Sequence, residues 1–294
     1  MSDLPVPAPN TDVPTQALDI QHDTDPAQDH GNARRIPHIG HAAMFFLIAV
    51  TFIFMSSVIT LLVIGAMTRE AALQHPVALI MSLLAAYALT FAVAIPVFPL
   101  IWRKPFFDGI SWNWRAASLR WWRLVLLGCA LALTAEFLEA LLKSSTKTDL
   151  TDLLKTPAAA WLTVLFGTLI APVCEEIAFR GFLLPALATA YDWLSLERTP
   201  AGFDRWQRST AHTRGALIFA ALLSSAAFTS IHGSQLHWAT GPLAILFVMS
   251  MIFSAVRIVT RSVAASTLVH IAYDGLLLLQ VIIVTHGFHH LDKL

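Results

Sequence analysis

The sequence predicts an all-α, polytopic bundle of about seven or eight transmembrane helices, and three observations support that prediction. Hydrophobic residues make up 56% of the 294-residue chain and charged residues only 13%, about half the charged share of an ordinary soluble domain. Apolar runs recur along the chain, most of them close to the roughly 20 residues that a helix needs to cross a bilayer. The tryptophans fall near the ends of these runs, as interfacial residues do.

The predicted spans follow the apolar runs in chain order. They cover residues 42–67, 77–101, 124–142, 158–190, 215–231, 242–259 and 262–284. The fourth run contains Pro172 and Pro185, and it forms an eighth span only if one of these prolines breaks the helix. An extension of the fifth run to Trp238 is the other alternative that the sequence leaves open.

The chain is expected to have four parts. Residues 1–37 are rich in proline and aspartate and poor in bulky apolar side chains, so they are predicted to form a disordered tail. Residues 38–123 hold the first transmembrane helices, and residues 124–285 hold the spans that carry polar groups. Residues 286–294 form a polar C-terminal end, in which His286, His289 and His290 are expected to be exposed.

The distribution of basic residues predicts the orientation and excludes some partners. Arginines and lysines concentrate in the second connection, in residues 198–214 and before the last span, which favours a cytoplasmic N-terminus in a bacterial inner membrane. A formal net charge of zero gives no support for nucleic-acid binding. The lipid bilayer is therefore the first expected partner.

Three ionisable side chains lie within six positions of the fourth apolar run: Glu175, Glu176 and Arg180. Each costs about 2.5–3.5 kcal/mol at membrane depth, so their presence points to chemistry more than to packing. Glu176 and Arg180 are four residues apart and share a helix face, where they can pair. Glu175 is rotated by about 100° from Glu176, so the two carboxylates need not do the same work.

Two other spans carry polar residues in helical register. His232 closes the fifth span, four residues after Phe228, and His270 lies in the seventh span, four residues before Asp274. Residues four apart share a face, so His270 and Asp274 are expected to point together into the bundle. The depth of His232 is a difficulty, because a fifth span that begins at residue 215 places this histidine near the far surface.

Carboxylates and histidines that converge in a protected cavity suit hydrolysis. Glu175 is the expected general base, with Glu176 and Arg180 as its brace. His232 and His270 either bind a divalent metal such as zinc or donate hydrogen bonds to an oxyanion. Asp274 would orient His270. The expected catalytic residues are Glu175, Glu176, Arg180, His232, His270 and Asp274, and the expected metal ligands are Glu175, His232, His270 and Asp274.

These motifs resemble those of the CPBP family, which comprises CAAX proteases and bacteriocin-processing enzymes and is also called Abi. Glu175-Glu176-Ile-Ala-Phe-Arg180 is similar to its Glu-Glu-x-x-x-Arg motif, Phe228-x-x-x-His232 to its second motif and His270-x-x-x-Asp274 to its third. Their order and spacing also fit, over roughly Leu124 to Val284. The resemblance implies an intramembrane endopeptidase that acts on a peptide or protein substrate at the membrane. Its histidines would act either as metal ligands or as partners of the oxyanion. Eukaryotic members carry asparagine where this chain has Asp274.

The competing hypothesis is a non-catalytic protein of the same fold, such as a transporter subunit, a scaffold or a bacteriocin-immunity factor. Every motif position retains a residue capable of chemistry, which favours the enzyme. No His-Glu-x-x-His is present, so the site-2 type of metalloprotease is excluded.

Overall fold

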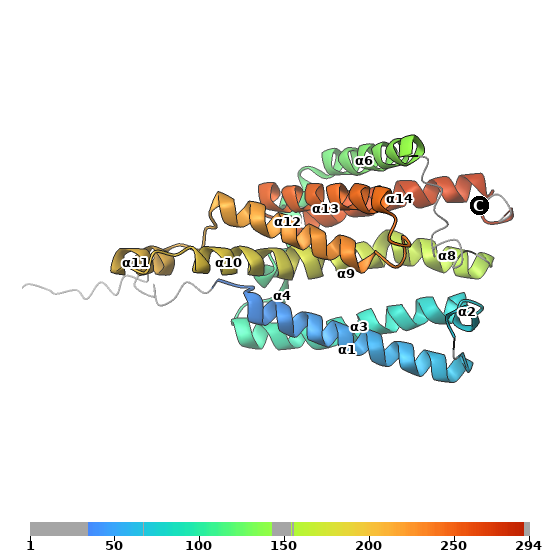
Figure 1. Ribbon diagram of the computed structural model, residues 1–294, viewed down its shortest axis with the longest axis horizontal. Coiled ribbons are helices and arrows are strands. Elements are labelled where there is room, and N and C mark those ends of the chain that lie inside the picture. Colours follow the sequence, from blue (N-terminus) through green and yellow to red (C-terminus); the bar gives the residue numbers. More distant parts are fainter. Residues whose placement is uncertain (1–34, 67, 143–153, 155, 291–294) are drawn as a thin grey trace, which may run out of the picture.

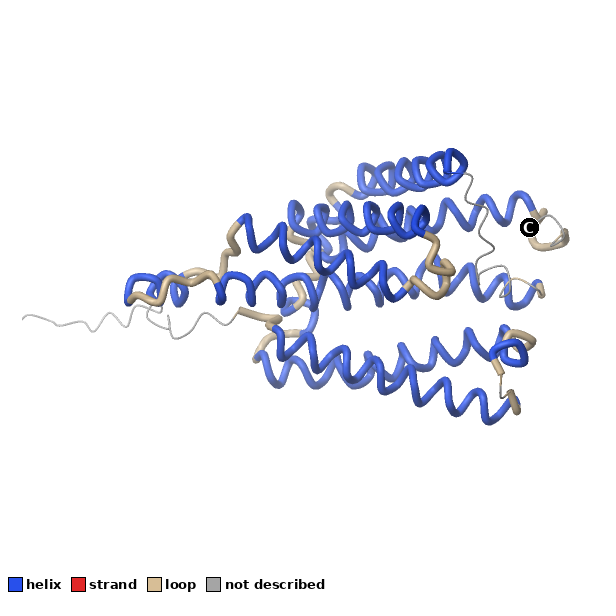
Figure 2. Tube along the Cα trace, in the orientation of Figure 1, coloured by secondary structure: helices blue, strands red, loops and turns tan. Residues whose placement is uncertain are grey.

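The computed structural model describes all residues except 1–34, 67, 143–153, 155 and 291–294. The predicted disordered tail therefore lies almost wholly outside the described residues. Within them every regular element is a helix (Figure 2), which confirms the all-α prediction. Seven helices are long and apolar enough to cross a membrane: α1 (Ile39–Ile64), α3 (Pro76–Trp102), α6 (Trp121–Leu142), the helix Pro157–Leu194, α12 (Arg214–Ile231), α13 (Thr240–Thr260) and α14 (Val263–Val284). The short helices are α2 (Arg69–Ala72), α4 (Phe106–Gly109), α5 (Trp114–Ser118) and α11 (Pro200–Arg208).

The first span ends earlier than predicted, whereas the fifth ends at the predicted residue. α1 stops at Ile64 because Gly65 adopts a left-handed conformation (φ 67°) and its amide closes the last turn, a common way for helices to end. α12 stops at Ile231, so the extension of the fifth span to Trp238 does not occur.

The helix Pro157–Leu194 is continuous in spite of its two internal prolines. It consists of α8 (Pro157–Leu165), a π turn (Phe166–Ile170), α9 (Ala171–Glu176), a second π turn (Ile177–Leu183) and α10 (Leu184–Leu194). Membrane helices absorb proline when local π adjustments and neighbouring helices satisfy the freed carbonyl groups. The prolines therefore do not create an eighth span, and the π turns adjoin the carboxylate pair, as π segments often adjoin functional sites.

The helix Pro157–Leu194 separates two groups of spans (Figure 1). The hairpin of α1 and α3 packs on one side, against the second π turn and α8 respectively. On the other side, α12 packs on α10 and α14 packs on α9, while α6 and α13 lie against α14. The pair of glutamates at the end of α9 is thus at the centre of the molecule.

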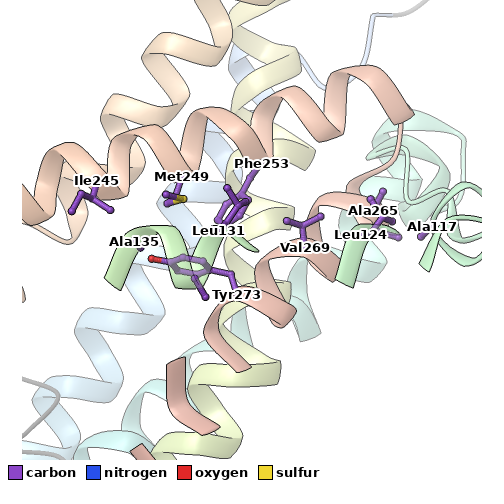
Figure 3. Packing of buried hydrophobic residues seen from close by; sticks show 12 residues of the cluster. Ala117, Leu124, Leu131, Ala135, Ile245, Met249, Phe253, Ala265, Val269 and Tyr273 are labelled. Atoms are coloured by element: carbon purple, nitrogen blue, oxygen red, sulfur yellow. The ribbon is translucent and has the colours of Figure 1, made fainter. Parts of the chain in front are cut away.

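Small residues let α6 approach α14 closely. A Cβ at Gly128 would lie 2.4 Å from the carbonyl oxygen of Val269, so only glycine fits there. Close approach through small residues is how membrane helices associate. Beyond this contact, Leu131, Met249 and Tyr273 belong to a buried cluster shared by α6, α13 and α14 (Figure 3). This packing sets the position of the α14 segment that carries His270.

Candidate active site

The helix Pro157–Leu194 gives its two adjacent glutamates different surroundings. Glu176 and Arg180 are fully buried, at 0% exposure. The side chain of Glu175 is 17% exposed. The rotation of about 100° between consecutive helical residues therefore separates an enclosed carboxylate from an accessible one, as the sequence indicated.

Arg180 is held by contacts from three helices. Its Nη1 donates to Oε1 of Glu176 at 2.8 Å, and its Nη2 donates to the carbonyl oxygen (2.8 Å) and the Oγ (2.7 Å) of Ser250 on α13. The guanidinium also lies 4.9 Å from the ring of Phe228 and 5.5 Å from that of Phe253. These aromatic faces attract a desolvated cation. The buried positive charge is thus compensated by one carboxylate, one serine and two rings.

His270 faces carboxylates from both of its ring nitrogens. Its Nδ1 lies 3.1 Å from Oε1 of Glu176, while its Nε2 lies 3.3 Å from Oδ2 of Asp274 and 3.9 Å from Oε2 of Glu175. Because Oε1 of Glu176 also accepts from Arg180, it is an acceptor for His270, and Nδ1 carries the proton. Glu176 thus orients His270 through Nδ1. Asp274, which the sequence analysis expected to orient this ring, lies beside Nε2 instead.

His232 caps the C-terminal end of α12, and its ring is oriented by the backbone. Its Nδ1 lies 2.8 Å from the carbonyl oxygen of Phe228, which can only accept, so Nδ1 is the protonated nitrogen. Its Nε2, 4.0 Å from Oε1 of Glu175, is the ring nitrogen that faces the accessible carboxylate.

The tilt of α12 resolves the difficulty over the depth of His232. α12 runs obliquely across the bundle. Its beginning lies closer to the α10–α11 end of the molecule than the adjacent ends of α13 and α14 do (Figure 1). Its first residues are tied to the end of α10, where Thr213 donates to Asp192 at 2.7 Å. The helix therefore starts further out than α14 does, and its last residue reaches the depth of His270.

The donor set has the chemistry of a zinc site, but its spacing is wide. A metal-bound histidine normally donates its other ring N–H to a carboxylate or a backbone carbonyl, as Nδ1 does here in both His232 and His270. Ligands around tetrahedral zinc lie about 3.3 Å apart, given zinc–ligand distances near 2.0–2.1 Å. The distances from Glu175 to the two rings, 4.0 and 3.9 Å, exceed this value. Among the described residues, no group of three or more acidic, histidine or cysteine side chains is arranged to hold a metal ion.

The structure brings further residues to the site that the sequence analysis did not identify. Ser250 and Phe253, which stacks on His270 at 4.6 Å, belong to no motif that the sequence analysis singled out. Tyr87 on α3 packs against Phe166 in the first π turn, with 5.6 Å between the ring centroids.

Comparison with known proteins identifies the segment that carries these residues. Residues 157–276 match the family model described as type II CAAX prenyl endopeptidase Rce1-like. The matched segment contains all three motifs and ends two residues after Asp274. No curated protein and no solved structure matches the chain.

Proposed function

From the membership of residues 157–276 in the CPBP family, we propose that this multi-pass membrane protein is an intramembrane endopeptidase that hydrolyses a peptide bond with water activated by Glu175. One observation carries the proposal. Glu175 is an accessible carboxylate within 4.0 Å of the imidazole nitrogens of two other spans, His232 and His270. Three separate segments thus supply one arrangement of a base and two polar partners.

In the proposed reaction, a water molecule beside Glu175 attacks the scissile carbonyl carbon. The carboxylate takes a proton from the water as the C–O bond forms, and it returns the proton to the leaving amine as the C–N bond breaks. Glu176, which is held by Arg180, orients His270 through Nδ1. Asp274 lies 3.3 Å from Nε2 of the same ring and is 25% exposed, so it borders the space that a substrate would enter.

A divalent metal such as zinc is proposed as the partner of the two histidines. Both Nδ1 atoms face acceptors, so in each ring Nε2 is the nitrogen that can bind a metal. The residues that would hold the metal are His232 and His270, with Glu175 or Asp274 as the acidic ligand. When bound, such an ion polarises a carbonyl group and lowers the pKa of water.

Metal content tests this part of the proposal. We expect the purified wild-type protein to contain about one zinc ion per chain, and a strong chelator to abolish cleavage until zinc is restored. His232→Ala and His270→Ala should reduce the bound zinc measured by elemental mass spectrometry, whereas His289→Ala, at an exposed C-terminal position, should not. If the wild-type protein contains no metal and its cleavage activity withstands the chelator, the histidines instead act through hydrogen bonds.

Cleavage itself tests the activity. In proteoliposomes that contain tagged test peptides, we expect His270→Ala to reduce the cleavage rate by roughly 10²–10³-fold, the effect of losing one polar partner of a reacting oxygen. His289→Ala should retain the wild-type rate. Equal rates for both variants would contradict the site and favour a non-catalytic protein of this fold.

The same assay distinguishes substrate classes. The test peptides include a prenylated C-terminal peptide, its unprenylated form and a single-span membrane peptide. The abundance of arginine in the connections 103–123 and 198–214 supports a cytoplasmic N-terminus, and we propose the bacterial inner membrane as the location. Tags on either end of the chain, probed by protease from outside the vesicle, check this orientation.

A further inference from the structure

A pocket of about 510 Å³ lies where the beginning of α1 meets the end of α10 and α11. Its walls include Arg35, His38, Ile39, Trp193, Trp206 and Gln207. Ile39 is the first residue of one candidate span, and Trp193 is the last but one of another. Two spans that cross the same bilayer end at this level, so the pocket lies at the boundary between the bilayer and water, where tryptophan is enriched.

Two tryptophan rings of the pocket wall lie side by side, and a guanidinium group stacks on each of them. The guanidinium carbon of Arg35 lies 3.7 Å from the centre of the Trp206 ring, and that of Arg198 lies 4.5 Å from the Trp193 ring. The two tryptophan rings are themselves 5.3 Å apart. A guanidinium that stacks on an aromatic face keeps its edge for planar recognition of an anion.

Arg35 is pre-organised by its surroundings. It pairs with Asp192 at 3.8 Å and donates to the carbonyl oxygens of Ser209 and Ala211, while its side chain is only 8% exposed. Its Nε nonetheless has no hydrogen-bond partner within the described residues. Buried polar groups are nearly always paired, so the protein itself leaves this guanidinium incompletely paired.

The surrounding charge is positive. The connection between α10 and α12, residues 195–214, carries Arg198, Arg205, Arg208 and Arg214 against Glu197 and Asp204, a difference of four minus two. Basic residues close to a membrane surface attract anionic lipids. The pocket also borders Ile39, which is exposed at the start of an apolar span, so a ligand here would touch both charge and hydrocarbon.

We propose that this pocket binds an anionic phospholipid, with the phosphate beside Arg35 and Gln207 and an acyl chain along Ile39. The alternative occupant is the segment of this chain that precedes Arg35, which carries six aspartates: Asp3, Asp12, Asp19, Asp23, Asp25 and Asp29. The lipid is favoured because it matches both the cations and the exposed apolar start of α1, whereas the aspartates match the cations alone.

Lipid binding to the full chain tests the proposal. We expect phosphatidylglycerol in phosphatidylcholine nanodiscs to raise the unfolding temperature and to remain bound in native mass spectrometry. Gln207→Glu adds a negative charge at an exposed position of the pocket, and Trp206→Leu removes the ring under Arg35. Each should weaken phosphatidylglycerol binding by roughly tenfold. The new carboxylate repels the lipid phosphate, and the loss of the ring removes the surface on which Arg35 is stacked.

Matched variants and competitors separate the possible outcomes. Gln74→Glu makes the same change at an exposed position before α3, at the other end of the α1–α3 hairpin, and should bind phosphatidylglycerol as the wild type does. Equal binding by wild type, Gln207→Glu and Trp206→Leu would overturn the proposal. So would the same stabilisation by inorganic phosphate in phosphatidylcholine alone, which indicates a soluble ligand. If phosphatidylglycerol binds and raises the unfolding temperature only after residues 2–33 are removed, the pocket is occupied by that segment in the full chain.

Discussion

Replacing Glu175 by glutamine is expected to abolish peptide-bond cleavage and to leave the fold intact. The amide keeps the shape of the side chain but cannot take a proton from water, and the loss of a general base reduces rates by roughly 10²–10⁴-fold. The nearest nitrogens of His270 and His232 lie 3.9 and 4.0 Å from Glu175, beyond hydrogen-bonding distance, so little native interaction is lost. The measurement is the initial rate of cleavage in proteoliposomes together with the unfolding temperature in detergent.

Glu139→Gln is the matched control for this prediction. It makes the same change at an exposed glutamate of α6 and should cleave at the wild-type rate. Glu175→Asp retains the carboxylate but moves it by one methylene, so we expect an intermediate rate. Cleavage by Glu175→Gln at the wild-type rate would remove Glu175 from the reaction and, with it, the proposed mechanism.

Replacing Arg180 by methionine is expected to destabilise the protein by roughly 3–5 kcal/mol, because the charge of Glu176 would remain buried without its partner. Both side chains are fully buried and joined at 2.8 Å, and no water is at hand in the bilayer to solvate the orphaned carboxylate. The measurement is the unfolding temperature, or the denaturant midpoint, of the purified protein.

The double variant Glu176→Gln/Arg180→Met tests the cause of that loss. Removing both charges should recover most of the stability, since replacing a whole buried pair costs far less than breaking it. Arg205→Met is the control: it breaks the pair with Glu197, in which both side chains are 69% exposed, and should leave stability unchanged. If the double variant is as unstable as Arg180→Met, then packing of the long side chain, and not charge, explains the effect.

Most of the fold was predictable because the bilayer limits what a sequence can form. Apolar runs of the necessary length must be helices, since no other single segment satisfies its own backbone in lipid. The predicted run 262–284 thus corresponds to Val263–Val284, and 158–190 to Pro157–Leu194. The continuity of that helix through Pro172 and Pro185 was not predictable, because it depends on π turns and on neighbouring helices that accommodate the freed carbonyl groups.

Local pairs in the site were also predictable, whereas contacts between helices were not. Residues four apart on one helix must share a face, so the pairs of Glu176 with Arg180 and of His270 with Asp274 follow from spacing. The approach of His232 to Glu175 depends on where α12 begins and how it tilts, which no short-range pattern contains. The contact of Arg180 with Ser250 joins residues 70 positions apart and has no sequence signal.

The sequence alone determined that the chain crosses a membrane, which ionisable residues lie within its spans and that Glu175 and Glu176 differ in orientation, because hydrophobicity and helical periodicity are properties of short segments. Only the tertiary structure decided that Glu176 orients His270, that His232 approaches Glu175 and that a pocket forms beside Trp206. Those relations depend on the relative placement of separate helices, and that placement is set by close packing at residues such as Gly128, not by any one segment.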